Sequence, residues 1–116
     1  MPQERSFNTA TIASSASLSG AVQARGLVLT AIAMPDGWDA ASITFQSSSD
    51  SGTTWVDLYD ETGEVEVSTT GADRVIALNQ TPFLGLEYLK VRSGTTGTPV
   101  NQTAERAITL IFTAVN

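Results

Sequence analysis

Residues 43 to 66 read ITFQSSSDSGTTWVDLYDETGEVE, and this stretch decides the fold class. Its first four residues alternate apolar and polar side chains, which is the period of a strand with one buried face. After a run of small polar residues, Trp55 to Tyr59 resumes with aromatic and β-branched residues that suit a pleated sheet. Asp60 to Gly63 breaks the chain again, and Glu64 to Val67 alternates once more. We therefore predict two consecutive hairpins that share the strand from Trp55 to Tyr59.

Strand-like segments continue on both sides of this stretch. The clearest are 74–78, 87–92 and 106–115, which are rich in β-branched residues or alternate cleanly. In the last of them, Ile108, Leu110 and Phe112 are predicted to face the core. In the second, Leu89 and Val91 are predicted to point to one side of a sheet and their neighbours to the other.

The segment from Val22 to Met34 contains a run, residues 27–34, that is apolar on both faces, so its structure is open to two interpretations. Alanine and leucine are good helix formers, which allows a helix over 21–33. Gly26 and the β-branched residues favour a strand that is buried on both sides. The Pro-Asp-Gly turn that follows predicts a bend, with Trp38 covering the core there.

About seven or eight strands with turns every 8 to 12 residues predict an all-β fold, an antiparallel β-sandwich of jelly-roll type. The 116 residues suffice for one domain. We assign residues 20–116 to the sandwich and residues 1–19 to an extended arm or edge strand. Residues 1–8 are predicted to be a flexible arm, because their polar side chains have no apolar periodicity to bury.

Composition excludes several functions. The net charge is −6 and the six basic residues are scattered, which argues against binding nucleic acid. Without cysteine or histidine, the chain lacks thiolate metal ligands, the commonest metal ligand and the usual general base. No signal peptide or membrane-spanning run is visible. We expect a protein made in a cytoplasm, soluble there, with no cofactor, no metal and no membrane partner.

Five carboxylates crowd ten residues of chain: Asp57, Asp60, Glu61, Glu64 and Glu66. Two of them across a cleft would suit a glycosidase, and Asp60, Glu61 and Glu64 offer oxygen ligands for calcium. Neither arrangement has a diagnostic spacing, and a solvated acidic hairpin tip is the simpler interpretation. We predict no active site and no enzymatic activity.

Ser48, Asp50, Gly52 and Trp55 match the Asp-box pattern Ser-x-Asp-x-Gly-x-Thr-Trp at its fixed positions. Asp50 can accept backbone hydrogen bonds across the turn, Gly52 can take positive φ, and Trp55 can tuck beneath. We predict a structural turn.

Three segments together resemble a family of small tailed-phage and prophage proteins: ITFQSSSDSGTTWVDLYDETG, EYLKVRSGT and PVNQ. The match covers roughly Pro35 to the C-terminus. The resemblance implies a structural virion component, and among such roles a capsid cement (decoration) protein is our first choice. It implies synthesis in the bacterial host cytoplasm and a location at the capsid surface of the virion. It also implies the major capsid protein as partner and a homo-oligomer, with a trimer favoured.

Two segments could supply the contacts of such a protein: the N-terminal arm, and the loop 93–103, which is long for a hairpin connection. The contact candidates are Phe7, Ile12, Thr95, Thr98, Pro99 and Asn101. The main alternative is a carbohydrate-binding module of a phage fibre or tail, with Trp38, Trp55 and Tyr59 stacking on sugars. A tail or baseplate component and a glycoside-cleaving enzyme are further alternatives.

Overall fold

The structure is a computed structural model that describes residues 5–114. Over these residues the chain forms ten strands and one short 3-10 helix. The elements are β1 (Arg5–Ile12), β2 (Val22–Gln23), β3 (Leu27–Ala33), β4 (Ile43–Ser48), β5 (Val56–Asp57), β6 (Tyr59–Asp60), β7 (Gly63–Glu64), β8 (Val75–Ala77), η1 (Thr81–Phe83), β9 (Tyr88–Ser93) and β10 (Arg106–Ala114).

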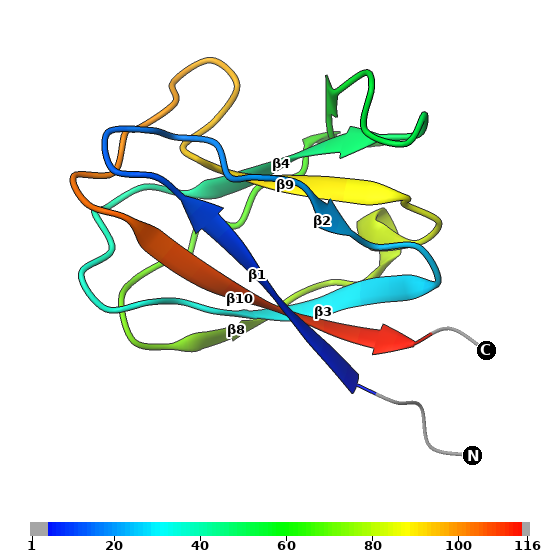
Figure 1. Ribbon diagram of the computed structural model, residues 1–116, viewed down its shortest axis with the longest axis horizontal. Coiled ribbons are helices and arrows are strands. Elements are labelled where there is room, and N and C mark those ends of the chain that lie inside the picture. The colour runs from blue at the N-terminus through cyan, green and yellow to red at the C-terminus, as the bar shows by residue number, and fades with distance from the viewer. Residues whose placement is uncertain (1–4, 115–116) are drawn as a thin grey trace.

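The strands form two four-stranded sheets and one small hairpin. One sheet has the order β1-β10-β3-β8, the other has the order β2-β9-β4-β5, and β6 pairs with β7 alone. Every pairing is antiparallel. Figure 1 shows the two larger sheets lying one above the other, with the core between them. The predicted all-β antiparallel sandwich is confirmed.

Side-chain alternation along the central strands builds the core. Ile108, Leu110 and Phe112 of β10 are fully buried, as their spacing predicts. Across the sandwich, Phe45 of β4 packs edge-on against Phe83 of η1, with ring centroids 5.0 Å apart. Such aromatic pairs add about 0.5–1.5 kcal/mol to the contribution of their buried area.

The segment 27–33 is a strand, and the helical interpretation is wrong. It is also not buried on both sides, because Thr30, Ala31 and Ala33 are partly exposed. The register against β10 shifts between Ile111 and Phe112, so that Thr30 is an extra residue in β3. Its hydroxyl donates to the Ile111 carbonyl oxygen at 3.0 Å. This bulge keeps the large side chains of β3 on the core side.

The N-terminal segment is an edge strand from Arg5 onward, so the predicted flexible arm is wrong for residues 5–8. β1 pairs with β10 along its whole length, from Arg5 opposite Thr113 to Ile12 opposite Arg106. Ala10 and Ile12 belong to the core, which anchors the strand. The first half of β1 is mostly exposed, which explains why its sequence lacks apolar periodicity. Residues 1–4 lie outside the described part.

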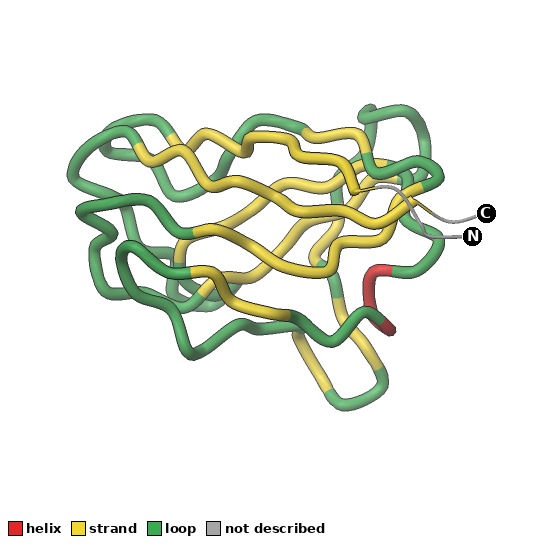
Figure 2. Tube along the Cα trace, turned by 90° about the horizontal axis from the view of Figure 1, so that it is seen from below, coloured by secondary structure: helices red, strands yellow, loops and turns green. Residues whose placement is uncertain are grey.

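The two predicted hairpins are present, but the strand they share is divided. β4 pairs with β5 and β6 pairs with β7, and Leu58 separates β5 from β6. Leu58 is buried, and its N–H donates to the Phe45 carbonyl oxygen at 3.0 Å. Figure 2 shows the β6–β7 hairpin projecting from the body of the sandwich. Within residues 5–114 no helix is long and apolar enough to cross a membrane.

Candidate functional site

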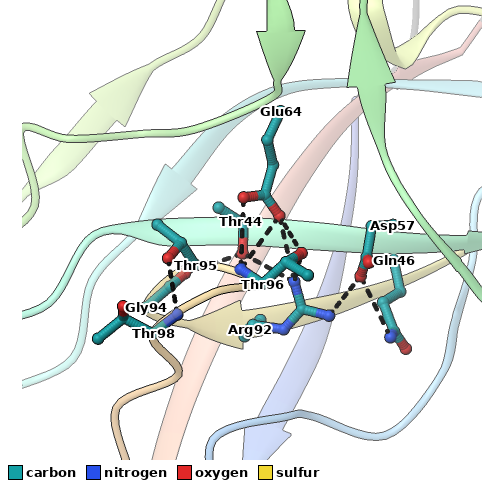
Figure 3. Close-up of polar contacts among 9 residues, drawn as sticks. All are labelled: Thr44, Gln46, Asp57, Glu64, Arg92, Gly94, Thr95, Thr96 and Thr98. Atoms are coloured by element: carbon teal, nitrogen blue, oxygen red, sulfur yellow. Dashed lines mark hydrogen bonds and ion pairs between the residues drawn. The ribbon is translucent and has the colours of Figure 1, made fainter.

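The loop 93–103 is held by a buried arginine on the outer face of β9. Arg92 is only 7% exposed, although its side chain points away from the core. Its Nη2 lies 2.5 Å from Asp57 Oδ1 and its Nη1 lies 3.3 Å from Glu64 Oε2. Nη1 also donates to the hydroxyls of Thr44 and Thr96. Figure 3 shows how these groups surround the guanidinium.

Thr96 joins the loop to the acidic β6–β7 hairpin. Its hydroxyl donates to Glu64 Oε2 at 2.5 Å, and its N–H lies 3.3 Å from both carboxylate oxygens of Glu64. Arg92, Glu64 and Thr96 therefore close a ring that connects strand, hairpin and loop (Figure 3). Such charge-assisted bonds fix the loop in one position, although those between Thr96 and Glu64 are exposed to water.

The acidic cluster of the sequence is divided in the structure between bound and exposed groups. Asp57 and Glu64 both pair with the guanidinium of Arg92. The Asp60 carboxylate accepts bonds from the hydroxyl and the N–H of Thr62 within its own turn. Glu61 and Glu66 are exposed. Among the described residues no group of three acidic side chains could hold a metal ion, so the calcium ligands considered above do not converge.

The hydrogen bond from Arg92 keeps the pKa of Asp57 below its ordinary value, despite partial burial of the carboxyl. A glycosidase acid needs the opposite shift, towards a raised pKa. Asp57 and Glu64 share one cation and stabilise the loop. This geometry gives the pair a structural role.

The far end of the loop is fixed by Gln102, which is fully buried. Its amide donates to the hydroxyl of Ser93 at 2.8 Å and to the carbonyl oxygen of Asp39 at 3.2 Å. Its Oε1 accepts from the Asp39 N–H at 2.9 Å and from Arg106 Nε at 3.1 Å. The Asp39 carboxylate in turn accepts from the N–H and the hydroxyl of Thr103. Each polar atom of the buried amide side chain thus has a partner, as buried amides require.

Between these two anchors the loop exposes a short tip. Thr95 and Thr98 exchange backbone hydrogen bonds of 3.2 Å, and Thr95 is half-buried. Thr98, Pro99 and Asn101 are exposed. Of the contact candidates in the loop, these three present their side chains to solvent.

The two candidates in β1 lie in different environments. Phe7 is 64% exposed on the edge strand, opposite Ile111. Ile12 is fully buried in the core, so it cannot anchor this chain on a neighbour, and that expectation is corrected. Residues 13–17 connect directly to the loop, since Ser15 N–H donates to the Gln102 carbonyl oxygen at 2.8 Å. Phe7 is near the start of β1, at the end away from residues 13–17. Figure 1 shows the start of β1 and the loop after β9 at opposite ends of the sandwich, so the structure does not bring this candidate together with the loop tip.

The structure places the Asp-box residues in one turn between β4 and β5. Asp50 Oδ1 accepts from the Thr54 N–H at 2.8 Å and from the Ser48 hydroxyl at 2.8 Å. Gly52 has φ +87°, in the left-handed region that favours glycine. Trp55 Nε1 donates to the Gly52 carbonyl oxygen at 3.0 Å. The hydrogen bond from the Thr54 backbone is the main reason that the pKa of Asp50 falls to about 2.

Replacing Asp50 with alanine should lower the melting temperature by a few degrees, on the order of 3–6 °C for a domain of this size. The variant leaves the Thr54 N–H without its acceptor and opens the turn. Differential scanning calorimetry at pH 7 measures the effect. Ser49→Ala in the same turn is the control, because Ser49 is exposed and makes no side-chain hydrogen bond among the described residues. Equal melting temperatures for the two variants would refute the assigned role of Asp50.

Acid should destabilise the protein. The carboxyls of Asp39, Asp50, Asp57 and Asp60 have lowered pKa values because each accepts hydrogen bonds that favour its ionised form. Their contribution is complete above the pKa of an unfolded aspartate, about 3.9, and is lost as the pH falls through the folded values. We expect a constant urea midpoint above about pH 5 and a decline towards about pH 2.

Two variants test the origin of this decline. Asp57→Asn should be less stable than the parent protein at pH 7, and its urea midpoint should fall less on acidification. Glu61→Gln, on the exposed hairpin turn, should keep the slope of the parent protein. A urea midpoint of the parent protein that rises between pH 5 and pH 3 would contradict the assignment.

The aromatic residues do not form a common sugar-binding platform. Trp38 is only 8% exposed, as its predicted place over the core requires, and its Nε1 donates to the Ala41 carbonyl oxygen. The ammonium group of Lys90 lies 4.5 Å from the ring centroid of Trp55 and covers one face of that half-buried ring. Tyr59 is 59% exposed on the β6–β7 hairpin. Of the three aromatics in the carbohydrate alternative, Tyr59 has its ring largely free.

Sequence reasoning missed the buried polar residues that fix the loop, above all Arg92, Gln102 and Asp39. Alternation predicts an outward side chain for Arg92, but three of the four groups that surround its guanidinium come from 28 to 48 residues away in the chain. The fourth, Thr96, is four residues away. Gln102 sits in a polar stretch, where no apolar neighbour signals burial. No local pattern could have identified either residue.

Comparison with known proteins adds little. No family model and no curated protein matches the chain. Among solved structures the chain is similar to the Yersinia pseudotuberculosis-derived mitogen (YPM), with 12% sequence identity and a TM-score of 0.43 over 100% of this chain and 89% of that one. Similarity at this level carries no argument about function.

Proposed function

We propose that this protein is a non-enzymatic structural component of a tailed-phage virion, most specifically a capsid cement protein. In this role it binds the major capsid protein at the surface of the shell and stabilises the head. The proposal rests on the sequence segments that resemble small phage proteins, two of which contain the residues around Arg92 and Gln102.

The observation that carries the proposal is the rigid support beneath an exposed loop tip. Arg92 and Gln102 hold the two ends of the loop 93–103 through a part-buried and a buried hydrogen bond, while Thr98, Pro99 and Asn101 face solvent. A loop that is already ordered loses little conformational entropy when it binds. A cement protein needs this kind of preformed surface and no reacting group.

The free edge of β1 supports an oligomer. β1 is the outermost strand of its sheet and carries the exposed ring of Phe7. Exposed edge strands pair readily with other chains, and a symmetric assembly would cover this one. A trimer remains the favoured state.

A density map of intact particles, with this chain traced, tests the location directly. Binding of purified protein to particles that lack it tests the surface. Asn101→Arg should weaken binding at least about tenfold, since a bulky charge is placed at the contact. Thr53→Arg, an equal change at an exposed position of the Asp-box turn, should bind like the parent protein. Location in the tail, or equal binding of both variants, would refute the proposal.

A glycan array distinguishes the carbohydrate-binding alternative. The cement proposal predicts no saturable sugar binding. Sugar binding that is lost in Trp55→Ala and kept in Trp38→Phe would replace the proposal with a carbohydrate-binding module.

A further inference from the structure

An open groove of about 380 Å³ runs between β8 and the chain that follows the β6–β7 hairpin. One wall comprises residues 76–79 with Pro82 and Phe83, and the other comprises residues 64–69 with Asp60 and Thr62. Figure 2 shows the hairpin beside the segment that leads from β8 to η1. The volume lies within the usual range of ligand-binding clefts.

The backbone of β8 presents unused hydrogen-bonding groups on the side away from β3. β8 is the last strand of its sheet and pairs with β3 alone. The Met34 N–H donates to the Arg74 carbonyl oxygen, and the Leu78 N–H donates to the Thr30 carbonyl oxygen. Every second residue along this edge is therefore hydrogen-bonded towards β3. In an antiparallel ladder the residues between them point their N–H and C=O groups the other way. Those residues are Val75 and Ala77.

The opposite wall has a similar backbone arrangement. Val67 exchanges hydrogen bonds of 2.9 and 2.8 Å with Ile43, and Val65 N–H donates to the Leu58 carbonyl oxygen. The backbone groups of Glu66 therefore point away from β4, and they have no backbone partner among the described residues. An extended chain in the groove would meet strand-like backbone on both sides.

The side chains of the groove combine apolar and acidic character. The half-buried residues Ile76 and Leu78 supply apolar surface, whereas Phe83 lines the groove with almost no exposed area. Asp60, Glu64 and Glu66 are among the residues that line the groove, and no Lys or Arg is. Glu64 is bound to Arg92, which leaves Asp60 and Glu66 to attract a cation.

The geometry points to a binding site for an extended, basic segment of another protein, which adds as a strand to the outer edge of β8. The backbone groups of Val75 and Ala77 supply main-chain hydrogen bonds, the apolar wall takes alternate side chains, and Asp60 and Glu66 select Lys or Arg. This inference does not depend on a role in a virion. The groove contains no residue of the 93–103 loop, although Glu64 lines the groove and also binds Thr96.

The test uses a fluorescein-labelled peptide, KVRVKVRVK, which alternates basic and apolar residues. Fluorescence anisotropy with the full chain should show saturable binding below about 1 mM. Glu66→Gln should weaken binding about threefold or more, and Asp60→Asn combined with Glu66→Gln should weaken it further. Glu61→Gln is the matched control, because it removes the same charge from the same hairpin outside the groove lining. It should change binding less than twofold.

Two further arms test strand addition itself. Ala77→Pro removes an N–H that β3 does not use, so the sandwich should stay folded by circular dichroism while peptide binding falls at least about fivefold. The same peptide N-methylated at alternate amides should bind at least tenfold more weakly. The inference would be overturned if the methylated peptide bound as tightly as the unmodified one, or if Glu66→Gln and Glu61→Gln lost the same affinity. Either result would show that the peptide binds by general charge attraction.

A second copy of the chain is the competing occupant of the groove. Sedimentation velocity of the parent protein and of Ala77→Pro distinguishes a second copy from a segment of another protein. Self-association that the proline variant abolishes would assign the groove to a subunit contact. No saturable peptide binding up to about 1 mM would also refute the proposed site.

Discussion

Arg92→Met should lower the free energy of unfolding by about 3 kcal/mol, because the variant leaves two carboxylates without their cation. Removing one member of a buried ion pair costs about 3–5 kcal/mol. The side chains of Asp57 and Glu64 are 28% and 16% exposed, so water can partly solvate them, which places the expected loss at the lower end. Urea denaturation at pH 7 measures the loss.

Arg25→Met is the matched control. Arg25 also pairs with a carboxylate, that of Glu87 at 2.9 Å, but its side chain is 55% exposed. Exposed pairs contribute about 0–1 kcal/mol, so this variant should be close to the parent protein. Adding Asp57→Asn and Glu64→Gln to Arg92→Met should restore part of the loss. Equal effects of the two single arginine variants would show that the Arg92 network is not a buried one.

Gly94→Ala should cost about 3 kcal/mol or more and loosen the loop tip. A Cβ at this position would lie 2.4 Å from the Thr98 carbonyl oxygen and 2.7 Å from the Val100 nitrogen, both backbone atoms that cannot move independently. The residue also has φ +91°, a conformation that alanine adopts only with strain. Thermal unfolding gives the stability, and amide hydrogen exchange reports the opening of residues 94–101.

Gly97→Ala in the same loop distinguishes this contact from a general need for glycine. No atom lies within 4 Å of a Cβ built at Gly97. The substitution should change stability by less than about 0.5 kcal/mol. Equal stability of Gly94→Ala and Gly97→Ala would contradict the close packing assigned to the turn between Gly94 and Pro99.

The parts of the fold that sequence could predict are those where one strand carries its own pattern. Leu89 and Val91, and likewise Ile108, Leu110 and Phe112, alternate because each strand buries one face, and that pattern is local. The edge strand was predicted only as an alternative, and residues 5–8 were assigned to a flexible arm, because the largely exposed first half of β1 needs few apolar residues. Its pairing with β10 depends on a partner about a hundred residues away, which periodicity cannot reveal.

The candidate site could likewise be predicted only where its residues form a local pattern. The loop 93–103 could be identified from its length and turn residues, and the Asp-box turn from its pattern. Arg92 looked like an ordinary outward residue of a strand, since the hairpin and the loop that cover it are brought together by tertiary packing. The groove beside β8 lies between two segments whose mutual placement no local pattern encodes.

The pairing of β1 with β10 determines where an attached cargo would sit. Because Arg5 lies opposite Thr113, both ends of the described chain leave the sandwich at the same pole, and the 93–103 loop lies at the other (Figure 1). A peptide or fluorescent domain fused to either terminus would project from that shared pole and leave the loop tip unobstructed. Both termini could therefore carry a label or a displayed peptide, while the loop tip at the other pole stays free to bind.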